Sequence, residues 1–165
     1  MIKVGILTVS DSCAGQKRQD VSGQTIRQML APDKFEIHEY KIVADEQKDI
    51  ERELTHFADE LRVDIVLTTG GTGLGPRDVT PEATAAVCGR MVPGLAETMR
   101  LEGQKKTKNA MLSRAVAGVR RNTLIINLPG SPKAVKESLE VILDVLPHAV
   151  DMLLGKGHEK EVRNV

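Results

Sequence analysis

Aromatic side chains are scarce in this 165-residue chain, which contains no Trp, one Tyr and two Phe. Proteins that bind single-stranded nucleic acids stack the bases on such rings, so a base-stacking surface is excluded. A net charge of one sign is also absent, because 23 basic residues balance 23 acidic ones. Nucleic-acid binders usually carry a basic excess, and the sequence therefore predicts no nucleic-acid partner.

Cysteines and long apolar runs are equally few. The two cysteines, Cys13 and Cys88, form no CxxC pair, and the four histidines show no metal-ligand spacing. Both facts argue against a zinc site or a disulfide framework. No apolar run approaches the ~20 residues of a membrane span, and Asp11 comes too early for a signal peptide. We expect a cytoplasmic protein that makes no membrane contact.

Strand and helix patterns alternate along the chain, which predicts an α/β fold of three layers, a mainly parallel sheet with helices on both faces. The predicted strands cover residues 3–10, 35–43, 64–69 and 123–128, with a shorter one at 116–119, and the predicted helices cover 23–30, 45–61, 93–103 and stretches that begin at 80 and 132. Asp45 and Thr80 are each expected at a helix N-cap. The polar segment from Gly15 to Ser22 is expected to form turns, and a turn also accounts for Asp11 and Ser12 at the end of the first strand. Residues 1–155 are expected to form a single domain, followed by a polar C-terminal tail at 156–165.

The predicted topology brings four segments together. In a parallel sheet all strands end at one edge, and ligands bind in the crevice outside that edge. The segments that follow the four strong strands are Asp11-Ser12, Asp45, the loop 70–78 and Pro129-Gly130-Ser131. The sequence therefore predicts a binding site made of these segments, three of which supply a carboxylate.

Four of the fourteen glycines fall within the six residues that follow the third predicted strand, Gly70-Gly71-Thr72-Gly73-Leu74-Gly75. Glycine backbones can turn their N–H groups toward an anion, so this loop indicates phosphate or nucleotide binding rather than a merely flexible connection. Pro76-Arg77 stand where a Walker A loop has Lys-Ser/Thr, and the GxGxG spacing does not match the dinucleotide fingerprint GxGxxG. A P-loop NTPase and a hydride-transfer enzyme are therefore disfavoured.

Individual polar residues near the loop have two interpretations. Asp78 can set the start of the next helix, or it can hold magnesium beside a phosphate-binding loop. N-capping alone accounts for Asp45, although its place on the same sheet edge as Asp78 favours a functional role. Arg77 and Arg114 are candidate anion contacts. Ser113 has no GxSxG elbow around it, which argues against a serine hydrolase.

Six sequence blocks carry a resemblance that covers nearly the whole chain. They are GILTVSD from Gly5, Asp45-Glu46, TTGGTG from Thr68, RDVTPEAT from Arg77, MLSR from Met111 and NLPG from Asn127. The glycine block that continues into RDVTPEAT is highly specific. On these blocks the chain resembles the MogA/MoaB family of molybdenum-cofactor biosynthesis, shared with the G domains of the plant molybdopterin adenylyltransferase and of gephyrin. The resemblance implies a MogA/MoaB-like fold.

The resemblance also implies a nucleotidyl transfer. Family enzymes transfer AMP from Mg-ATP to the terminal phosphate of molybdopterin and release pyrophosphate, so Mg²⁺ is the implied cofactor and ATP and molybdopterin are the implied substrates. The family's two essential aspartates match Asp45 and Asp78, which are assigned both the catalytic and the metal-binding role. The assigned nucleotide-binding residues are Gly70, Gly71, Thr72, Gly73, Asp11 and Ser12, and the assigned pterin- and phosphate-binding residues are Arg77, Ser113, Arg114, Pro129, Gly130 and Ser131.

Some features of the resemblance leave alternatives open. Gly103 and Lys108 stand where some members have Ser and Pro, which affects the details of pterin contact. A MoaB-like branch binds pterin or acts as a scaffold without clear transferase activity, but the intact RDVTP block from Arg77 favours the active enzymes. A general nucleotide-binding protein is a third hypothesis. By resemblance we also expect a homo-trimer or hexamer and a molybdenum insertase as a partner.

Overall fold

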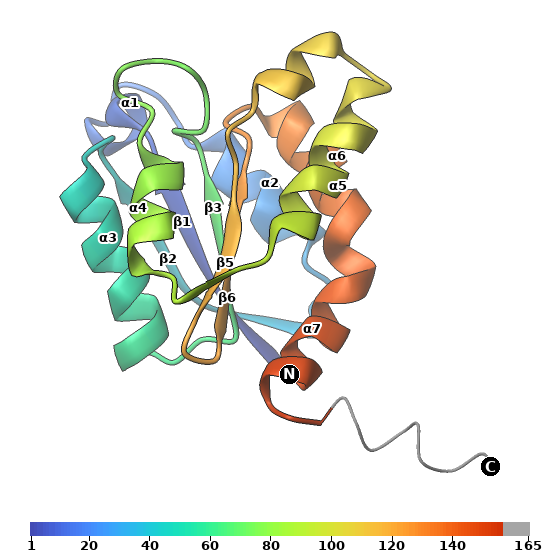
Figure 1. Cartoon of the computed structure of the whole chain (residues 1–165). Helices are drawn as coiled ribbons and strands as arrows, with labels where there is room; N and C mark the ends of the chain where they lie inside the picture. Colours follow the sequence, from blue (N-terminus) through green and yellow to red (C-terminus); the bar gives the residue numbers. More distant parts are fainter. Residues whose placement is uncertain (157–165) are drawn as a thin grey trace.

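A six-stranded sheet in the order β2-β1-β3-β6-β5-β4 runs through the centre of the structure (Figure 1). The structure is a computed structural model and describes residues 1–156. The strands are β1 (Ile2–Val9), β2 (Phe35–Val43), β3 (Ile65–Thr69), β4 (Arg90–Met91), β5 (Ala117–Arg120) and β6 (Thr123–Leu128). β1, β2, β3 and β6 are parallel, while β5 and β4 form an antiparallel edge. The prediction of a mainly parallel sheet is confirmed.

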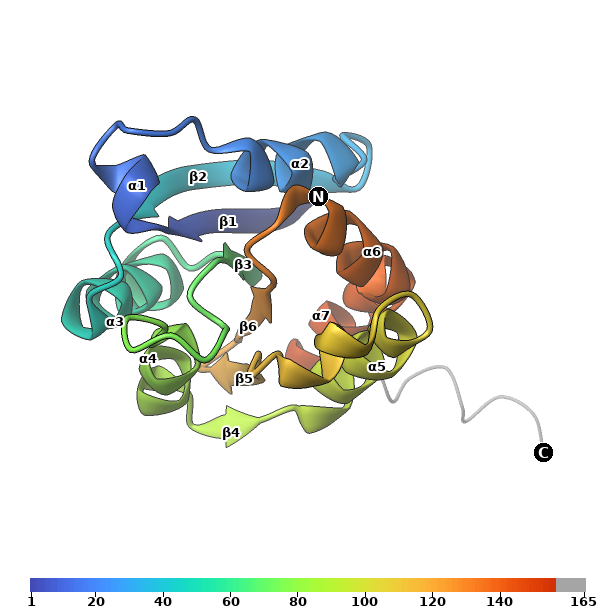
Figure 2. The same ribbon diagram turned by 90° about the horizontal axis from the view of Figure 1, so that it is seen from above.

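Helices cover both faces of this sheet, as the view from above shows (Figure 2). They are α1 (Asp11–Ala14), α2 (Val21–Met29), α3 (Gln47–Thr55), α4 (Thr80–Val87), α5 (Pro93–Gln104), α6 (Pro132–Ile142) and α7 (Leu146–Leu153). A π-helical turn, His56–Glu60, extends α3, and 3-10 turns lie at Lys108–Leu112 and Leu143–Val145. α3 and α4 pack on one face, and α2, α5, α6 and α7 pack on the other.

Alternating side chains of the central strands build a core on each face. In β1, Val4 and Ile6 join the core beneath α2, α5, α6 and α7, whereas Leu7 and Val9 join the core beneath α3 and α4. Successive side chains of a strand point to opposite faces, so a strand that is covered on both sides needs a nearly continuous apolar run. The central strands are thereby fixed in the middle of the fold, and their carboxyl ends are held in place.

Two predicted helix caps are wrong. The N-cap of α3 is Glu46, which makes no side-chain capping bond. The Asp45 carboxylate instead accepts a hydrogen bond from a residue distant in the sequence. The N-cap of α4 is Val79, and Thr80 is the first helical residue, with its hydroxyl donating to the carbonyl oxygen of Gly70 at 2.9 Å. Tertiary hydrogen bonds therefore use both side chains that local sequence assigns to capping.

The segment between β1 and β2 is more helical than predicted. α1 begins directly at Asp11, where a turn was expected. α2 begins at Val21, two residues before the prediction, because the Asp20 carboxylate caps it by accepting from the N–H of Gly23 at 2.9 Å. The predicted helix that begins at 132 is confirmed, with Ser131 as its N-cap.

The predicted polar tail at 156–165 lies outside the described residues apart from its first residue, so the division at residue 155 stays a prediction. Within residues 1–156, no helix has the length and apolar character needed to cross a membrane.

Candidate active site

The carboxyl ends of the four parallel strands lie side by side at one edge of the sheet. The last residue of β1, Val9, pairs with Val43 of β2. Thr69 at the end of β3 pairs with Thr8 of β1 and with Leu128 of β6. The segments that leave these strands are therefore neighbours, as the topology predicts.

The glycine loop begins with two left-handed residues. Gly70 has a φ of 94° and Gly71 a φ of 67°. A Cβ at Gly70 would overlap the carbonyl oxygen of Val9, and one at Gly71 would overlap the hydroxyl of Thr80. Thr80 also fixes the turn through its backbone N–H, which donates to the carbonyl oxygen of Gly71 at 3.1 Å. Only glycine suits both positions, because other residues strain in this conformation and no room is left for a side chain.

Asp11 and Asp45 hold each other's backbones. The Asp11 N–H donates to Asp45 Oδ2 at 2.8 Å, and the Asp45 N–H donates to Asp11 Oδ1 at 3.0 Å. Partial burial raises the pKa of the Asp45 carboxyl above its ordinary value, and the charges of Asp11 and Asp78 raise it further, while the Asp11 N–H opposes the shift. Because the Asp78 charge contributes to this pKa shift, the two carboxylates lie close enough to interact.

Asp78 lies where the glycine loop returns to α4. Its Oδ2 accepts from the N–H of Gly75 at 2.8 Å, and its own N–H donates to the carbonyl oxygen of Gly75 at 3.0 Å. Arg114 supports the same loop, because its Nη2 donates to the Asp78 carbonyl oxygen at 2.6 Å and its Nε donates to the Gly73 carbonyl oxygen at 2.8 Å. Arg114 also pairs with Glu82, which lowers the pKa of Glu82 below its ordinary value.

Asp45 and Asp78 each have a second carboxylate oxygen, Oδ1, that accepts no hydrogen bond from residues 1–156. Magnesium in phosphoryl-transfer sites is usually held by one or two protein carboxylates together with waters and substrate phosphates. No group of three or more His, Cys, Asp or Glu side chains in the described part of the chain is arranged to hold a metal ion. The donor set therefore fits a magnesium ion that a phosphate substrate helps to bind.

Arg77, predicted as a phosphate contact, is paired with carboxylates. Its Nε donates to Asp11 Oδ2 at 2.8 Å and its Nη2 to Asp11 Oδ1 at 3.0 Å. The same Nη2 lies 2.9 Å from Glu46 Oε1. This guanidinium lowers the pKa of the Asp11 carboxyl through the hydrogen bond. In the structure Arg77 ties the glycine loop to α1 and to the start of α3, and contact with a phosphate would require these pairs to open.

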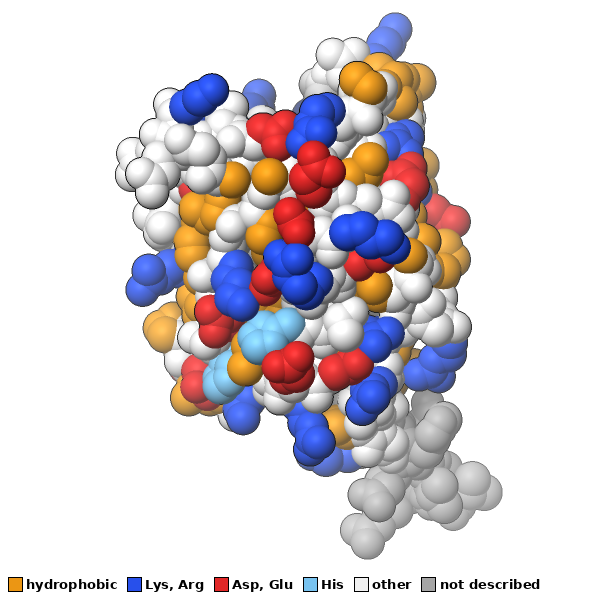
Figure 3. Space-filling model, turned by 90° about the vertical axis from the view of Figure 1, so that its left-hand side faces the viewer, with side chains coloured by type: hydrophobic (Ala, Val, Ile, Leu, Met, Phe, Trp, Pro, Cys, Tyr) orange, Lys and Arg blue, Asp and Glu red, His pale blue; other side chains and the backbone are white. Residues whose placement is uncertain are grey.

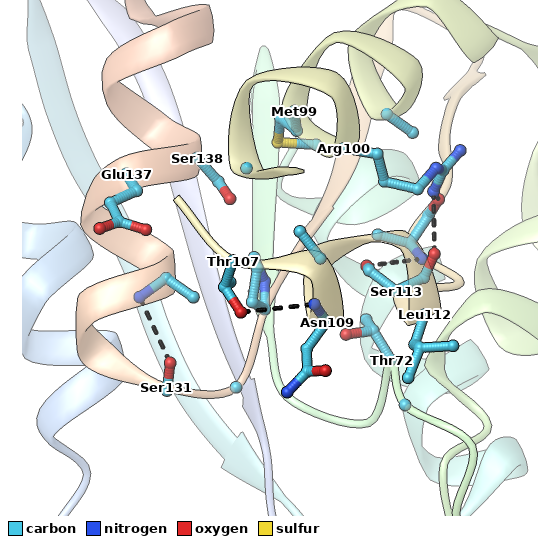
Figure 4. Close-up of a pocket in the computed structure, with 18 of the residues that line it drawn as sticks. Thr72, Met99, Arg100, Thr107, Asn109, Leu112, Ser113, Ser131, Glu137 and Ser138 are labelled. Atoms are coloured by element: carbon cyan, nitrogen blue, oxygen red, sulfur yellow. Dashed lines mark hydrogen bonds between the residues drawn. The ribbon is translucent and has the colours of Figure 1, made fainter. Parts of the chain in front are cut away.

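A cavity of about 870 Å³ opens between α5 and α6, and we call it the larger cavity (Figure 4). Figure 4 shows Thr107, Asn109, Leu112 and Ser113 on its α5 side, opposite Ser131, Glu137 and Ser138 on its α6 side. The predicted site residues that line it are Gly71, Thr72, Gly73, Asp78, Ser113, Pro129, Gly130 and Ser131. Its walls combine apolar surface from residues such as Met99 with hydroxyl and amide groups, a composition that is typical of small-molecule sites.

A second cavity of about 620 Å³, the smaller cavity, lies on the other side of the glycine loop. The predicted site residues that line it are Asp45, Gly70, Gly71, Asp78, Gly130 and Ser131. Four residues line both cavities, and we call them the shared wall: Gly71, Asp78, Gly130 and Ser131. Neither cavity is lined by Asp11, Ser12, Arg77 or Arg114. The first three of these residues lie beside the smaller cavity.

Several lining residues escape the sequence prediction. Thr107, Asn109 and Ser138 line the larger cavity, and Asp20 and Ser22 line the smaller one. An Asp directly before a helix is an N-cap signal, which would have drawn attention to Asp20. The other four lie on helices or turns without a distinctive pattern, so no local signal marks them.

Charged side chains away from the sheet edge pair mainly with each other. Figure 3 shows Lys and Arg interspersed with Asp and Glu over the face that carries α3. Lys41 lies 2.8 Å from Glu53, and Lys48 lies 2.8 Å from Glu51. Such surface pairs stabilise a fold only slightly.

Comparisons with known proteins identify similar sequences and similar folds. Residues 5–148 match the family model described as "Probable molybdopterin binding domain". The chain is 43% identical over 167 residues to a molybdopterin adenylyltransferase of Helicobacter pylori strain J99, covering 99% of this chain and 94% of that one. A crystal structure of the molybdopterin biosynthesis enzyme MoaB from Thermus thermophilus superposes with a TM-score of 0.89 and 55% identity, covering 94% and 98% of the two chains. The Mog protein of Mycobacterium ulcerans gives a TM-score of 0.86 at 40% identity, covering 93% and 99%.

Proposed function

Since the chain belongs to the family of probable molybdopterin-binding domains, we propose that it is a nucleotidyltransferase that moves the adenylyl group of Mg-ATP to the terminal phosphate of molybdopterin. The observation that carries the proposal is the shared wall, which places Asp78 and the glycine loop between two cavities. Two substrates bound on opposite sides of this wall would present their phosphates to each other. The names of relatives at 40–43% identity support this reaction.

The two cavities suit different substrates. The larger cavity offers hydroxyl and amide groups from Thr107, Asn109, Ser113 and Ser138, which can bond the polar edge of a pterin. The smaller cavity is lined by Gly70 and the shared wall, whose backbone turns suit the phosphates of a nucleotide. We therefore assign molybdopterin to the larger cavity and the ATP phosphates to the smaller one.

The proposed reaction is a single displacement at phosphorus. An oxygen of the molybdopterin phosphate attacks the α-phosphorus of ATP, the bond from this phosphorus to the bridging oxygen breaks, and pyrophosphate leaves. The protein positions the two substrates and offers backbone N–H groups of the glycine loop to the developing charge. Asp45 and Asp78 would hold Mg²⁺, which neutralises phosphate charge when bound.

The setting of the reaction is part of the same proposal. We propose that the protein acts in the cytoplasm as a homo-trimer or hexamer and passes its adenylylated product to a molybdenum insertase. Light scattering on the purified protein measures the oligomer, and a monomer in solution would overturn that part alone.

The test of the proposed function combines purified protein, Mg-ATP and molybdopterin. We expect adenylylated molybdopterin and pyrophosphate in equal amounts, and we expect Asp78→Asn to lose turnover while it still binds the pterin. Equal turnover of wild type and Asp78→Asn would contradict the proposed mechanism.

The second candidate function is that of a non-catalytic pterin-binding or scaffold protein. The observation that favours it is the 55% identity to the Thermus structure described as MoaB. It predicts pterin binding without an ATP-dependent product. Calorimetry separates a third outcome, a general nucleotide-binding protein, in which ATP binds and the pterin never does.

A further inference from the structure

A buried carboxylate without a cationic partner lies at the start of α2. Asp20 is only 7% exposed and forms no ion pair with any residue that the structure describes. Burial of an ionised carboxylate is costly unless hydrogen bonds satisfy it. Asp20 also lines the smaller cavity. An Asp that only caps a helix can do so on the surface and avoid the cost of burial, so the buried position of Asp20 suggests a role beyond capping.

Three donors satisfy this carboxylate. Its Oδ1 accepts from the Gly23 N–H at 2.9 Å, and its Oδ2 accepts from the hydroxyls of Thr8, at 2.5 Å, and Tyr40. Burial, followed by the hydrogen bond to Asp20, raises the pKa of Tyr40 to about 12, so its hydroxyl remains a donor at neutral pH. Because both oxygens of Asp20 are engaged, this carboxylate differs from Asp45 and Asp78, which each retain an oxygen for a ligand.

The start of α2 is in turn bonded to the shared wall. The Ser22 hydroxyl donates to the carbonyl oxygen of Gly130 at 2.6 Å. From the β3 side, the Thr69 hydroxyl donates to the carbonyl oxygen of Pro129, also at 2.6 Å. The Pro129-Gly130 turn is therefore held from two sides, and α2 provides one of them.

We propose that Asp20, Tyr40 and Ser22 form a positioning network that sets the shared wall and so aligns the two substrates for transfer. The inference rests on the proposed function, because alignment matters only if two substrates react across this wall. Tyr40 and Thr8 fix Asp20, Asp20 fixes the first turn of α2, and Ser22 transmits that position to Gly130. None of the three residues touches the reacting atoms in this arrangement.

The physical reason for a large effect is the sensitivity of transfer reactions to geometry. A displacement of about 1 Å between reacting groups can lower the rate on the order of 100-fold, even when each substrate still binds. Loss of the Ser22 or Tyr40 hydroxyl would loosen the wall without removing a charged group from the smaller cavity. The expected signature is a fall in kcat with little change in KM.

The experiment compares Ser22→Ala and Tyr40→Phe with wild type in the adenylylation assay, with melting temperatures recorded for each protein. We expect kcat to fall about 10- to 100-fold while KM for ATP and for molybdopterin stays within about threefold. Ser22→Thr retains the hydroxyl and is expected to restore kcat. Thr25→Ala is the matched control, because the Thr25 hydroxyl bonds only within α2, to the carbonyl oxygen of Val21 at 2.8 Å.

The outcomes separate this inference from the proposed function. If wild type forms product and both variants keep kcat within about twofold, the positioning network is overturned while the proposed function stands. An equal fall in kcat for Thr25→Ala would also overturn it, because helix stability alone would then explain the effect. If wild type forms no product, the proposed function fails and the network fails with it.

Discussion

The two cavities at the sheet edge have walls of different origin. The smaller cavity is bounded by strand ends and the first turns of helices, including Ser10, Asp45 and Gly70. The larger cavity is bounded by the sides of α5 and α6 and by the 3-10 turn Lys108–Leu112. Strand register fixes the first set of walls, whereas helix packing and one irregular turn fix the second. A substitution in one set of walls can therefore alter one cavity without the other, whereas a substitution in the shared wall alters both.

The largest expected effect follows from Gly70→Ala, because Gly70 lines the smaller cavity and directly precedes Gly71 of the shared wall. The new Cβ would overlap the Val9 carbonyl oxygen in a backbone conformation that favours glycine. We expect the free energy of unfolding to fall by about 2–4 kcal/mol, with both ligands lost. Urea denaturation measures the change. Gly94→Ala is the control, because a Cβ there meets nothing within 4 Å.

The next largest effect separates the cavities by removing charge from the smaller one. Asp45→Asn keeps the shape but removes a carboxylate from the cavity that we assign to the ATP phosphates. We expect turnover to fall about 100-fold or more, while pterin affinity changes less than about twofold. Steady-state kinetics and pterin titration measure the two quantities. A parallel loss of pterin affinity would contradict the separation of the cavities.

Arg100→Met tests the larger cavity in the same way. Arg100 Nη1 donates to the carbonyl oxygens of Ser113, at 3.2 Å, and Ala115, at 2.8 Å, and thereby closes one wall. We expect the free energy of unfolding to fall by about 1.5 kcal/mol and pterin affinity to fall about tenfold, with ATP affinity retained. Thr98→Ala, which loses a bond within α5 only, should leave both affinities at the wild-type level.

The smallest effect concerns a pair outside both cavities. Asp59 Oδ2 lies 2.6 Å from Arg120 Nη2, and this bond lowers the pKa of Asp59 below its ordinary value. The pair therefore stabilises the fold fully above the unfolded pKa of about 4, and this contribution is lost as pH falls through the folded pKa. We expect Asp59→Asn to cost about 1 kcal/mol at pH 7, and the gap to wild type to close on acidification. A gap that persists at pH 2, or any change in turnover, would contradict this assignment.

The sequence predicts the smaller cavity better than the larger one, for a physical reason. Buried strands carry a local apolar pattern, and parallel topology alone places Asp45, Asp78 and Gly70 at a common edge. The glycine-rich loop is likewise a local signal. These features explain why the fold class and the meeting of the four segments agree with the structure.

The larger cavity depends on contacts between elements distant in the sequence. Asn109 lies in a 3-10 turn that has no periodic signal, and Ser138 lies on a helix whose pattern identifies only its buried face. The roles of Arg77 and Asp45 cannot be predicted from local sequence for the same reason. Arg77 pairs with Asp11 and Glu46, and Asp45 bonds Asp11, and these partners come together only in the folded chain.

The scarcity of aromatic residues has a spectroscopic consequence. Tyr40 is the only tyrosine and the chain has no tryptophan, so the near-ultraviolet signal of the protein comes chiefly from the hydroxyl-bearing ring that bonds Asp20. A change in that signal between wild type and Ser22→Ala would report movement at the start of α2. The protein thus carries its own optical label beside the smaller cavity, on a residue that bonds Asp20 of its lining, and no dye needs to be attached to follow it.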